Sequence, residues 1–546
     1  MREGFRQSMA WLHTWAGLLV CWVLFLVFVA GTASYFRDEI SLWMKPELHA
    51  AAVTPVSDVV AAQNAIRMLE KEAADSPRWF ITLPTDRNPE LTVGWTSPPV
   101  KGEKGRGKFN NAQLNPATGE RLAAVRETRG GDFIYRLHYD LHYMPALWAR
   151  WIIGFCAMFM LVAIISGVIT HKRIFKDFFT FRPKKGQRSW LDAHNAVAVL
   201  ALPYHLMITY SGLVTLMFMY MPFGAQVAYN GDEKTFLAES FRQAEVKKPA
   251  GQPAQLAAIA PMMAQAEQHW NGGQVGRLTI NNPGDANATI QIRREQEKKL
   301  SHLRQSMQFD GASGAMISTM GDEASAAAET RGVLYGLHVA EFANPLLRAL
   351  FFLCGFAGCA MVATGALLWA VKTRQGYAKV LAKGGRIGYG LRLVDGLNIG
   401  AIAGLPIALA SYFWANRLIE VGIEKRSEAE IRWFFIAWGI AAIIAHIRPT
   451  RRMWQCQLLV GGVLFALIPV LNVFTTHSHL GVTLFQSKGP VAVAGFDLFV
   501  LGFGLLLIYA AKRLAPRKVE LKLNAKNKAI EKKPHDGDHS SLREAT

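Results

Sequence analysis

The chain is poor in cysteine, and its hydrophilic stretches contain none. All five cysteines lie in or beside apolar segments: Cys21, Cys156, Cys354, Cys359 and Cys456. The hydrophilic stretches therefore have no disulfide framework to support them. The spacing from Cys354 to Cys359 matches no metal or redox motif, so we interpret the cysteines as small packing residues.

Three other signatures are missing. The glycines of KGGRIGYG (383–390) follow no strand and have no acidic residue placed to hold a ribose, so the chain lacks a domain for NAD(P)H or flavin. The net charge of +19 comes with no basic face interleaved with aromatic residues, which argues against nucleic-acid binding. The first apolar block lacks a small-residue cleavage site and is too long for a signal-peptide core, which predicts a retained anchor.

Long apolar blocks are what the chain does have, and 51% of its residues are hydrophobic. Eight blocks are long enough to span a hydrocarbon core of about 30 Å, which needs roughly 20 helical residues. They run approximately over 10–36, 146–171, 190–221, 345–371, 391–416, 431–447, 454–475 and 489–511. The sequence therefore predicts a polytopic α-helical membrane protein of about eight spans.

The basic residues predict the orientation of these spans. Segment 172–189 has seven Lys/Arg against one acid, 372–392 has six and no acid, and the tail 512–546 is basic as well. All lie on one side if there are eight spans, and the positive-inside rule makes that side cytoplasmic. The hydrophilic segments 37–145 and 222–344 then lie outside, which is the periplasm for the inner membrane of a bacterium.

The chain contains an internal duplication. WLHTWAGLL (11–19) aligns with WLDAHNAVAVL (190–200), and each is followed by a glycine 18 residues after its histidine. LHYDLHY (137–143) and LHVAEFA (337–343) precede the two returning spans. We expect two units of helix, outer domain and returning helix, which together form a four-helix core from spans 1–36, 146–221 and 345–371.

The hydrophilic segments repeat too. Each has a helix-patterned stretch, at 57–74 and at 253–270, followed by short strand-like runs such as WFITL and GRLTI. Each closes with a tight turn, in AQLNPATGERL and MQFDGASGAMI. This pattern predicts two small α+β modules, and neither contains the clustered acids or nucleophiles of a catalytic site.

Histidines are the chemically informative residues of the apolar blocks. Seven lie in them or at their ends: His13, His138, His142, His171, His194, His205 and His338. A polar side chain in a membrane usually faces the bundle interior and has a partner. Imidazoles at matched depths without a neighbouring carboxylate suit a b-type haem with two histidine ligands.

Depth limits which histidines can share a haem. His13, His194 and His171 lie near the cytoplasmic ends of their spans, whereas His138, His142 and His338 lie near the outer ends. The 29 residues from His142 to His171 make about 43 Å of helix, so one haem cannot use both. Two haems, one near each face, are the economical arrangement.

Several assignments stay open. His138 or His171 could be a capping or interfacial residue, and one of His138 and His142 could be a surface residue. His205 follows His194 by 11 residues, which in a continuous helix places it about 16 Å further on and roughly 20° round. It would ligate the outer haem or bridge the two haems.

These motifs together resemble the PepSY-associated transmembrane proteins, which include iron-regulated membrane proteins and inner-membrane ferric-siderophore reductases. The resemblance covers about residues 5–375, including HKRIFKDFFTFRPKKGQRSWLDAH. It implies two PepSY-like periplasmic domains, b-type haems in the helical core and reduction of iron(III) siderophore in the periplasm. Residues 390–511 form an extension with four further spans and almost no intramembrane charge, which we interpret as a packing or partner-docking bundle.

Two functional hypotheses follow. As an enzyme, the protein would take electrons from membrane quinol or a cytoplasmic flavoprotein reductase and reduce a ferric siderophore outside. As a non-enzyme, it would be a siderophore or iron permease, or a PepSY-type regulator. A permease or regulator has no need of histidines at paired depths, and on that ground the reductase is favoured.

The topology can be tested with reporter fusions. Fusions at residues 110 and 280 should be active only outside the cytoplasm, and a fusion at the C-terminus only inside it, because the basic loops set the orientation. An external C-terminus would show that the number of spans is wrong by one.

Overall fold

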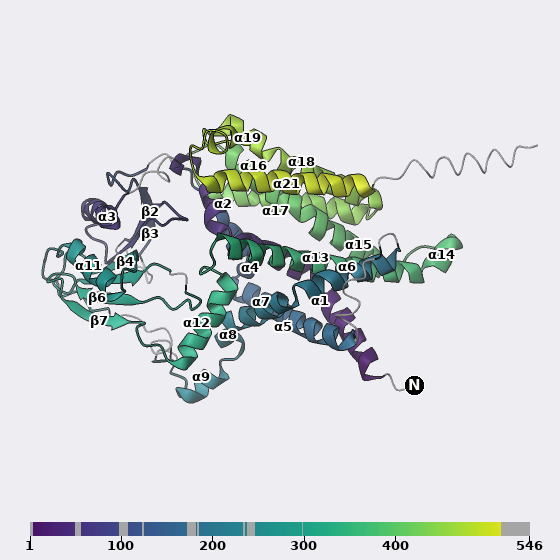
Figure 1. Ribbon diagram of the computed structural model, residues 1–546, viewed down its shortest axis with the longest axis horizontal. Helices are drawn as coiled ribbons and strands as arrows, with labels where there is room; N and C mark the ends of the chain where they lie inside the picture. The colour runs from purple at the N-terminus through teal and green to yellow at the C-terminus, as the bar shows by residue number, and fades with distance from the viewer. Residues whose placement is uncertain are drawn as a thin grey trace, which may run out of the picture.

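The structure is a computed structural model that describes residues 4–49, 56–97, 107–122, 125–171, 182, 185–232, 235–236, 246–296 and 299–514. A helical bundle makes up most of the molecule, and a β-sheet lies at one end of it (Figure 1). Among these residues, seven helices are long and apolar enough to cross a membrane, and a bent pair adds an eighth span. The predicted polytopic α-helical membrane protein is confirmed; most of the basic loop 172–189 and the tail after 514 lie outside the described residues.

Six of the eight spans are longer than their apolar blocks. They are α1 (Phe5–Ser34), α5 (Ala146–Thr170), α6 (Gln187–Leu200) with α7 (Leu202–Thr215), α13 (Pro345–Gly376), α15 to α16 (Tyr389–Leu418), α17 (Arg426–Ile447), α18 (Arg451–Ala466) with α19 (Ile468–Thr475), and α21 (Val491–Leu514). In the first half, α1 packs on α5 and α13, and α6 packs on α13. Short helices connect the longer elements: η1 (Pro46–Leu48), α8 (Met217–Tyr220), α9 (Phe223–Ala228), α14 (Ala378–Ala382) and α20 (Leu480–Thr483).

The third span is broken. Helices α6 and α7 meet at Ala201 with a bend of 68°. Pro203 lies in the first turn of α7 and causes the break, because proline lacks the N–H of a helical hydrogen bond and disfavours a helical residue before it. The placement of His205 on the same face as His194 assumed a continuous helix, and it is wrong for this reason.

Two histidine-bearing segments are separate helices. His138 lies on α4 (Gly130–Asp140) and His338 on α12 (Ala326–Val339). Each helix ends at a residue with left-handed backbone, Leu141 and Ala340, both with φ of 52°. Both helices precede the returning spans, which begin at Ala146 and Pro345. Helix α4 packs on α1, and α12 packs on α7.

The strands of both hydrophilic segments form one antiparallel sheet of seven strands in the order β3-β2-β1-β4-β5-β6-β7. The first segment gives β1 (Arg78–Thr82), β2 (Leu91–Thr96) and β3 (Phe109–Leu114), and the second gives β4 (Val275–Asn281), β5 (Thr289–Arg294), β6 (Ser306–Asp310) and β7 (Met316–Met320). Strands β1 and β4 pair antiparallel, so the two expected modules share a sheet.

The two faces of this sheet differ in chemistry. Alternate residues such as Trp79, Ile81 and Leu278 are buried in a core with α3 (Asp58–Glu72) and α11 (Ile259–His269). Since successive strand residues point to opposite faces, the intervening residues form the other face. That face is mostly polar.

The extension, residues 389–514, contains buried charges at its sheet-side end. Trp43, the last residue of α2 (Arg37–Trp43), donates its indole N–H to Asp497 Oδ1 at 2.9 Å. Arg417 lies 3.8 Å from the centre of the Trp43 ring and donates to its backbone oxygen at 2.6 Å. Arg417 lies just past the apolar block 391–416, whereas Asp497 lies inside the block 489–511, so the extension places buried charges beside the first hydrophilic segment.

The same end of the extension holds the start of α4. Arg426 and Glu430 are fully buried and form an ion pair, and Thr128 donates its hydroxyl to Glu430 Oε2 at 2.5 Å. Tyr412 donates its hydroxyl to the backbone oxygen of Gly130 at 3.0 Å. The extension therefore fixes the helix that carries His138.

Replacing Glu430 should show how much this buried network contributes to the stability of the protein. Glu430→Ala leaves the Arg426 guanidinium buried without its counter-charge, which typically costs about 3–5 kcal/mol. Thermal unfolding in detergent should show a clear fall in the midpoint. The matched control is Glu424→Ala, because the Glu424 side chain is 89% exposed in its pair with Lys425; an equal fall in both variants would contradict a buried network.

Candidate functional site

Four histidines are held in the same way, each by a neighbouring helix. The Nδ1 atom lies within hydrogen-bond distance of an oxygen on that helix in the pairs His13–Ala163 (2.8 Å), His138–Val27 (2.8 Å), His194–Met361 (2.9 Å) and His338–Ser211 (3.1 Å). In the first three pairs the acceptor is a carbonyl, so a neutral imidazole must carry its proton on Nδ1. The Nε2 lone pair is then free. Histidines that bind metals usually donate their other ring N–H in this manner.

A glycine faces each of these four rings. A Cβ at the glycine would lie very close to the ring Cε1 in the pairs Gly31–His138 (2.8 Å), Gly167–His13 (3.1 Å), Gly212–His338 (3.0 Å) and Gly365–His194 (3.1 Å). A larger residue would push the imidazole away from its helix. This explains the glycines that recur in the duplicated sequence: each makes room for a histidine.

The four rings form two facing pairs. The ring centres of His13 and His194 are 6.3 Å apart, and those of His138 and His338 are 6.0 Å apart. We call these the far pair and the sheet-side pair. Two metal–nitrogen bonds of about 2 Å on opposite sides of one metal, together with the ring radii, separate ring centres by about 6 Å. Both pairs therefore fit the expected axial ligation of a haem.

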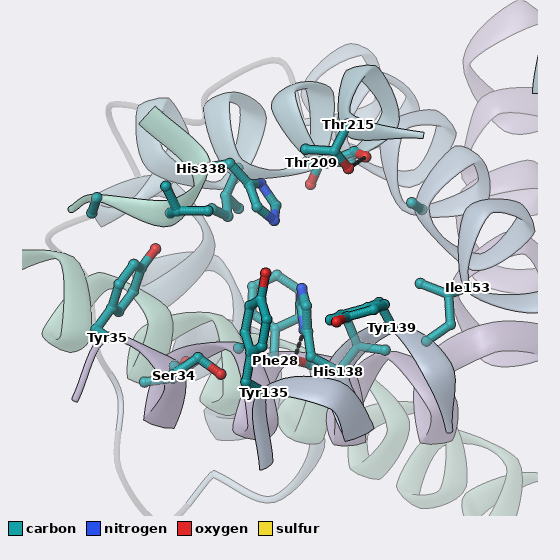
Figure 2. Close-up of a pocket in the computed structure, with 18 of the residues that line it drawn as sticks. Phe28, Ser34, Tyr35, Tyr135, His138, Tyr139, Ile153, Thr209, Thr215 and His338 are labelled. Atoms are coloured by element: carbon teal, nitrogen blue, oxygen red, sulfur yellow. Dashed lines mark hydrogen bonds between the residues drawn. The ribbon is translucent and has the colours of Figure 1, made fainter. Parts of the chain in front are cut away.

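A cavity of about 400 Å³ adjoins the sheet-side pair. Figure 2 shows His138 and His338 projecting into it from opposite sides, with Phe28, Tyr135 and Tyr139 beside His138. Its floor is apolar, and charged side chains line its mouth: Arg37, Asp38, Arg87, Arg150 and Glu341. The cavity thus has space for a flat ligand between the imidazoles and polar groups towards the sheet.

Glu341 is an anion at the mouth of this cavity. Burial alone would raise the pKa of its carboxyl, but the adjacent His302 and Arg304 outweigh burial and lower the pKa to about 2. Arg304 donates to Glu341 Oε2 at 2.9 Å. The carboxylate is therefore ionised throughout the physiological pH range, and it links the cavity to the loop before β6.

The other three candidate histidines do not join a pair. His142 lies on the loop after α4, stacked on Phe435 at 5.7 Å and 3.7 Å from Glu428. His171 accepts a hydrogen bond from Asn195 Nδ2 at 2.9 Å, where α5 ends. The structure thus brings together four of the seven sequence candidates.

His205 is the third unpaired candidate. It is fully buried, and among the described residues neither ring nitrogen makes a hydrogen bond of normal length and angle, although the backbone of Ala198 and of Cys354 lies near the ring. Its ring meets the edge of Phe28 with centres 6.2 Å apart.

The tyrosines around the cavity were missed at the sequence level, although a signal was present. Tyr135 precedes His138 by three residues in YRLH, and Tyr335 precedes His338 by three in YGLH. Residues three apart lie on the same face of a helix, so both tyrosines line the cavity with their histidines. The repeat of Tyr-x-Leu-His in both units could have predicted them.

A family model matches most of this chain. The family model described as the PepSY-associated TM region matches residues 10–372. This range contains both histidine pairs, the whole sheet and all four helices of the core. No curated protein matches the chain.

His205 offers a test of which histidines have partners. Because its ring nitrogens are buried without hydrogen bonds, His205→Leu removes a desolvation cost of about 1–3 kcal/mol, and stability should be unchanged or higher. His171→Leu should lower stability instead, since it removes the bond with Asn195. A lower unfolding midpoint for His205→Leu in the purified protein would mean that His205 binds a ligand.

Proposed function

This chain belongs to the PepSY-associated TM family, and we propose that it is a haem b-containing inner-membrane oxidoreductase. It passes electrons across the membrane and reduces ferric siderophore to the iron(II) state in the periplasm, so that iron is released. The single observation that carries the proposal is the presence of two facing histidine pairs, each with its Nδ1 atoms engaged and its Nε2 atoms free. We propose about two haems per chain.

The four paired histidines would hold the haems: His13 with His194, and His138 with His338. A bound haem supplies a one-electron carrier. The Nδ1 hydrogen bonds fix the orientation of the imidazoles and raise their basicity as ligands. Apolar residues of the core, such as Leu24 and those around it, keep water away from the space between the pairs.

The two pairs lie at different depths, which suits transfer across a membrane. Helix α1 contacts both pairs. His13 belongs to the far pair, and the Val27 carbonyl accepts a hydrogen bond from His138 of the sheet-side pair. These 14 residues of helix correspond to about 21 Å. The far pair would lie near the cytoplasmic side, where electrons from membrane quinol or a cytoplasmic reductase enter. The sheet-side pair would lie near the periplasm.

The chelate is proposed to bind outside the sheet-side pair. If both imidazoles of the sheet-side pair held one haem, they would leave no room on its iron for the substrate, and the chain's own polar residues at the cavity mouth would hold the chelate. Arg87 and Glu341 are among them. Hard oxygen donors such as hydroxamates favour iron(III), so reduction weakens the complex and releases the metal.

Haem content of the purified protein tests the proposal, and two variants test the two sites separately. His338→Ala should remove one low-spin haem and stop reduction of external ferric siderophore, while the remaining haem is still reduced by quinol. His13→Ala should leave the sheet-side haem bound, although quinol no longer reduces it. Pyridine haemochrome assays and absorption spectra measure both outcomes.

The control for these variants is His142→Ala, because His142 lies apart from both pairs and should not affect haem content. Haem absent from wild-type protein made with ample haem would contradict the oxidoreductase. Two haems retained in His338→Ala would contradict the assigned pairing.

A further inference from the structure

Two arginines on the sheet stand directly opposite each other. Arg277 on β4 is the cross-strand partner of Arg293 on β5. Directly opposed like charges destabilise a sheet. Among the described residues neither guanidinium forms an ion pair, whereas Arg304 nearby is paired with Glu341. An arrangement that costs stability and lacks a counter-charge indicates a ligand that supplies one.

The electrostatic strain is visible at both arginines. The Arg277 side chain is exposed at its surface, but the strands and rings around it remove part of its solvent, and this desolvation, followed by the charges of Arg293 and Arg304, lowers the pKa of its guanidinium. Burial and Arg304 lower the pKa of Arg293 in the same direction. Three cations therefore affect one another at this end of the sheet, and an anion bound among them would relieve their repulsion.

The residues around this pair suit a small organic anion. The Arg277 guanidinium lies 5.2 Å from the centre of the Phe80 ring, which presents an apolar surface. Gln291 is two residues before Arg293 and donates its amide to Ser306 Oγ at 3.2 Å. All of these lie on the polar face of the sheet, because the core with α3 and α11 occupies the other face.

The arginine pair lies at the end of the sheet that meets the cavity. Arg277 pairs with Thr82, the last residue of β1, and Arg87 lies five residues further along and lines the cavity mouth. On the other side, Arg304 contacts Glu341, which also lines the mouth. A ligand on the arginines is therefore adjacent to the space in front of His138 and His338.

We propose that Arg277 and Arg293 bind the carboxylate arms of an anionic iron(III) chelate, with Phe80 and Gln291 bordering the site. The guanidinium fork matches a carboxylate in two parallel hydrogen bonds, and one anion neutralises both arginines. This inference rests on the proposed function and specifies its substrate: a siderophore that keeps free carboxylates when it binds iron, such as a citrate-based dihydroxamate whose amino-acid arms carry carboxylates of their own.

The test uses gallium(III) complexes, which have the charge and shape of iron(III) complexes but are not reduced under these conditions. The full-length protein in detergent is titrated with the anionic gallium complex of a citrate-dihydroxamate, and with the cationic complex of a linear trihydroxamate that carries a free ammonium group. Calorimetry should show tighter binding of the anionic complex.

The decisive variant is Arg277→Gln with Arg293→Gln. It should weaken binding of the anionic complex about a hundredfold, at roughly tenfold for each charged hydrogen-bonding partner removed. The unfolding midpoint should rise in the same variant, because the like-charge pair is gone. Loss of binding together with higher stability separates a binding role from a folding defect. Arg293→Lys keeps the positive charge but loses the planar guanidinium, so its affinity for the anionic complex should lie between that of the wild type and that of the double variant.

Arg121→Gln is the matched control. Arg121 lies near Trp95 and Glu72, beside β3, which is the edge strand of the sheet farthest from β4 on the side of the first segment. Its affinity should equal that of the wild type. The proposal is overturned if the double variant binds the anionic complex as tightly as the wild type, or if both complexes bind equally well. It is also overturned if the variant loses only its binding to vesicles of phosphatidylglycerol, which would identify a lipid headgroup as the ligand.

The outcome is independent of the haem assay. Arginine-dependent binding of the gallium complex in a protein without haem would support the anion site and contradict the oxidoreductase. Two haems with no arginine-dependent binding would support the oxidoreductase and contradict the anion site.

Discussion

The structure depends on one constraint: a polar group inside an apolar bundle is costly unless it has a partner. Each paired histidine satisfies half of this demand through its Nδ1 atom, which lies against an oxygen on the adjacent helix beside a glycine. These contacts join α1 to α5, α6 to α13, α4 to α1 and α12 to α7. The same few hydrogen bonds therefore set the helix packing and the orientation of the imidazoles. They leave the Nε2 lone pairs available to bind a metal.

The local parts of this arrangement could be predicted from the sequence. Apolar runs gave the spans, and the duplicated spacing gave the equivalence of His13 with His194 and of His138 with His338. The direction of the third span could not be obtained from spacing alone, because Pro203 bends it. The choice of His138 over His142 depends on the left-handed turn after α4, which follows from tertiary packing. The joining of β1 to β4 is a long-range pairing that no local pattern reveals.

The two halves of the duplication are supported differently. Helix α4 is anchored at its start by the buried residues Tyr412, Glu430 and Arg426 of the extension. Helix α12 begins instead with a side-chain cap, in which Ser325 accepts from the Ala328 amide. The extension therefore acts on one half of the sheet-side pair. Its buried charges, among them Asp497 inside an apolar block and Arg417 just past one, connect it to the first hydrophilic segment.

The pairing of β1 with β4 also sets an order of assembly. Arg78 of β1 bonds Asn281 of β4, 203 residues later in the chain, and two membrane crossings lie between them. Until the second hydrophilic segment has been synthesised, β1 is an edge strand with unpaired backbone groups, which is the kind of edge that associates with other chains. The sheet closes late, and contacts of such long range form slowly. During synthesis, the first segment therefore exists for a time as an incomplete half-sheet, and any factor that shields its edge would act in that interval.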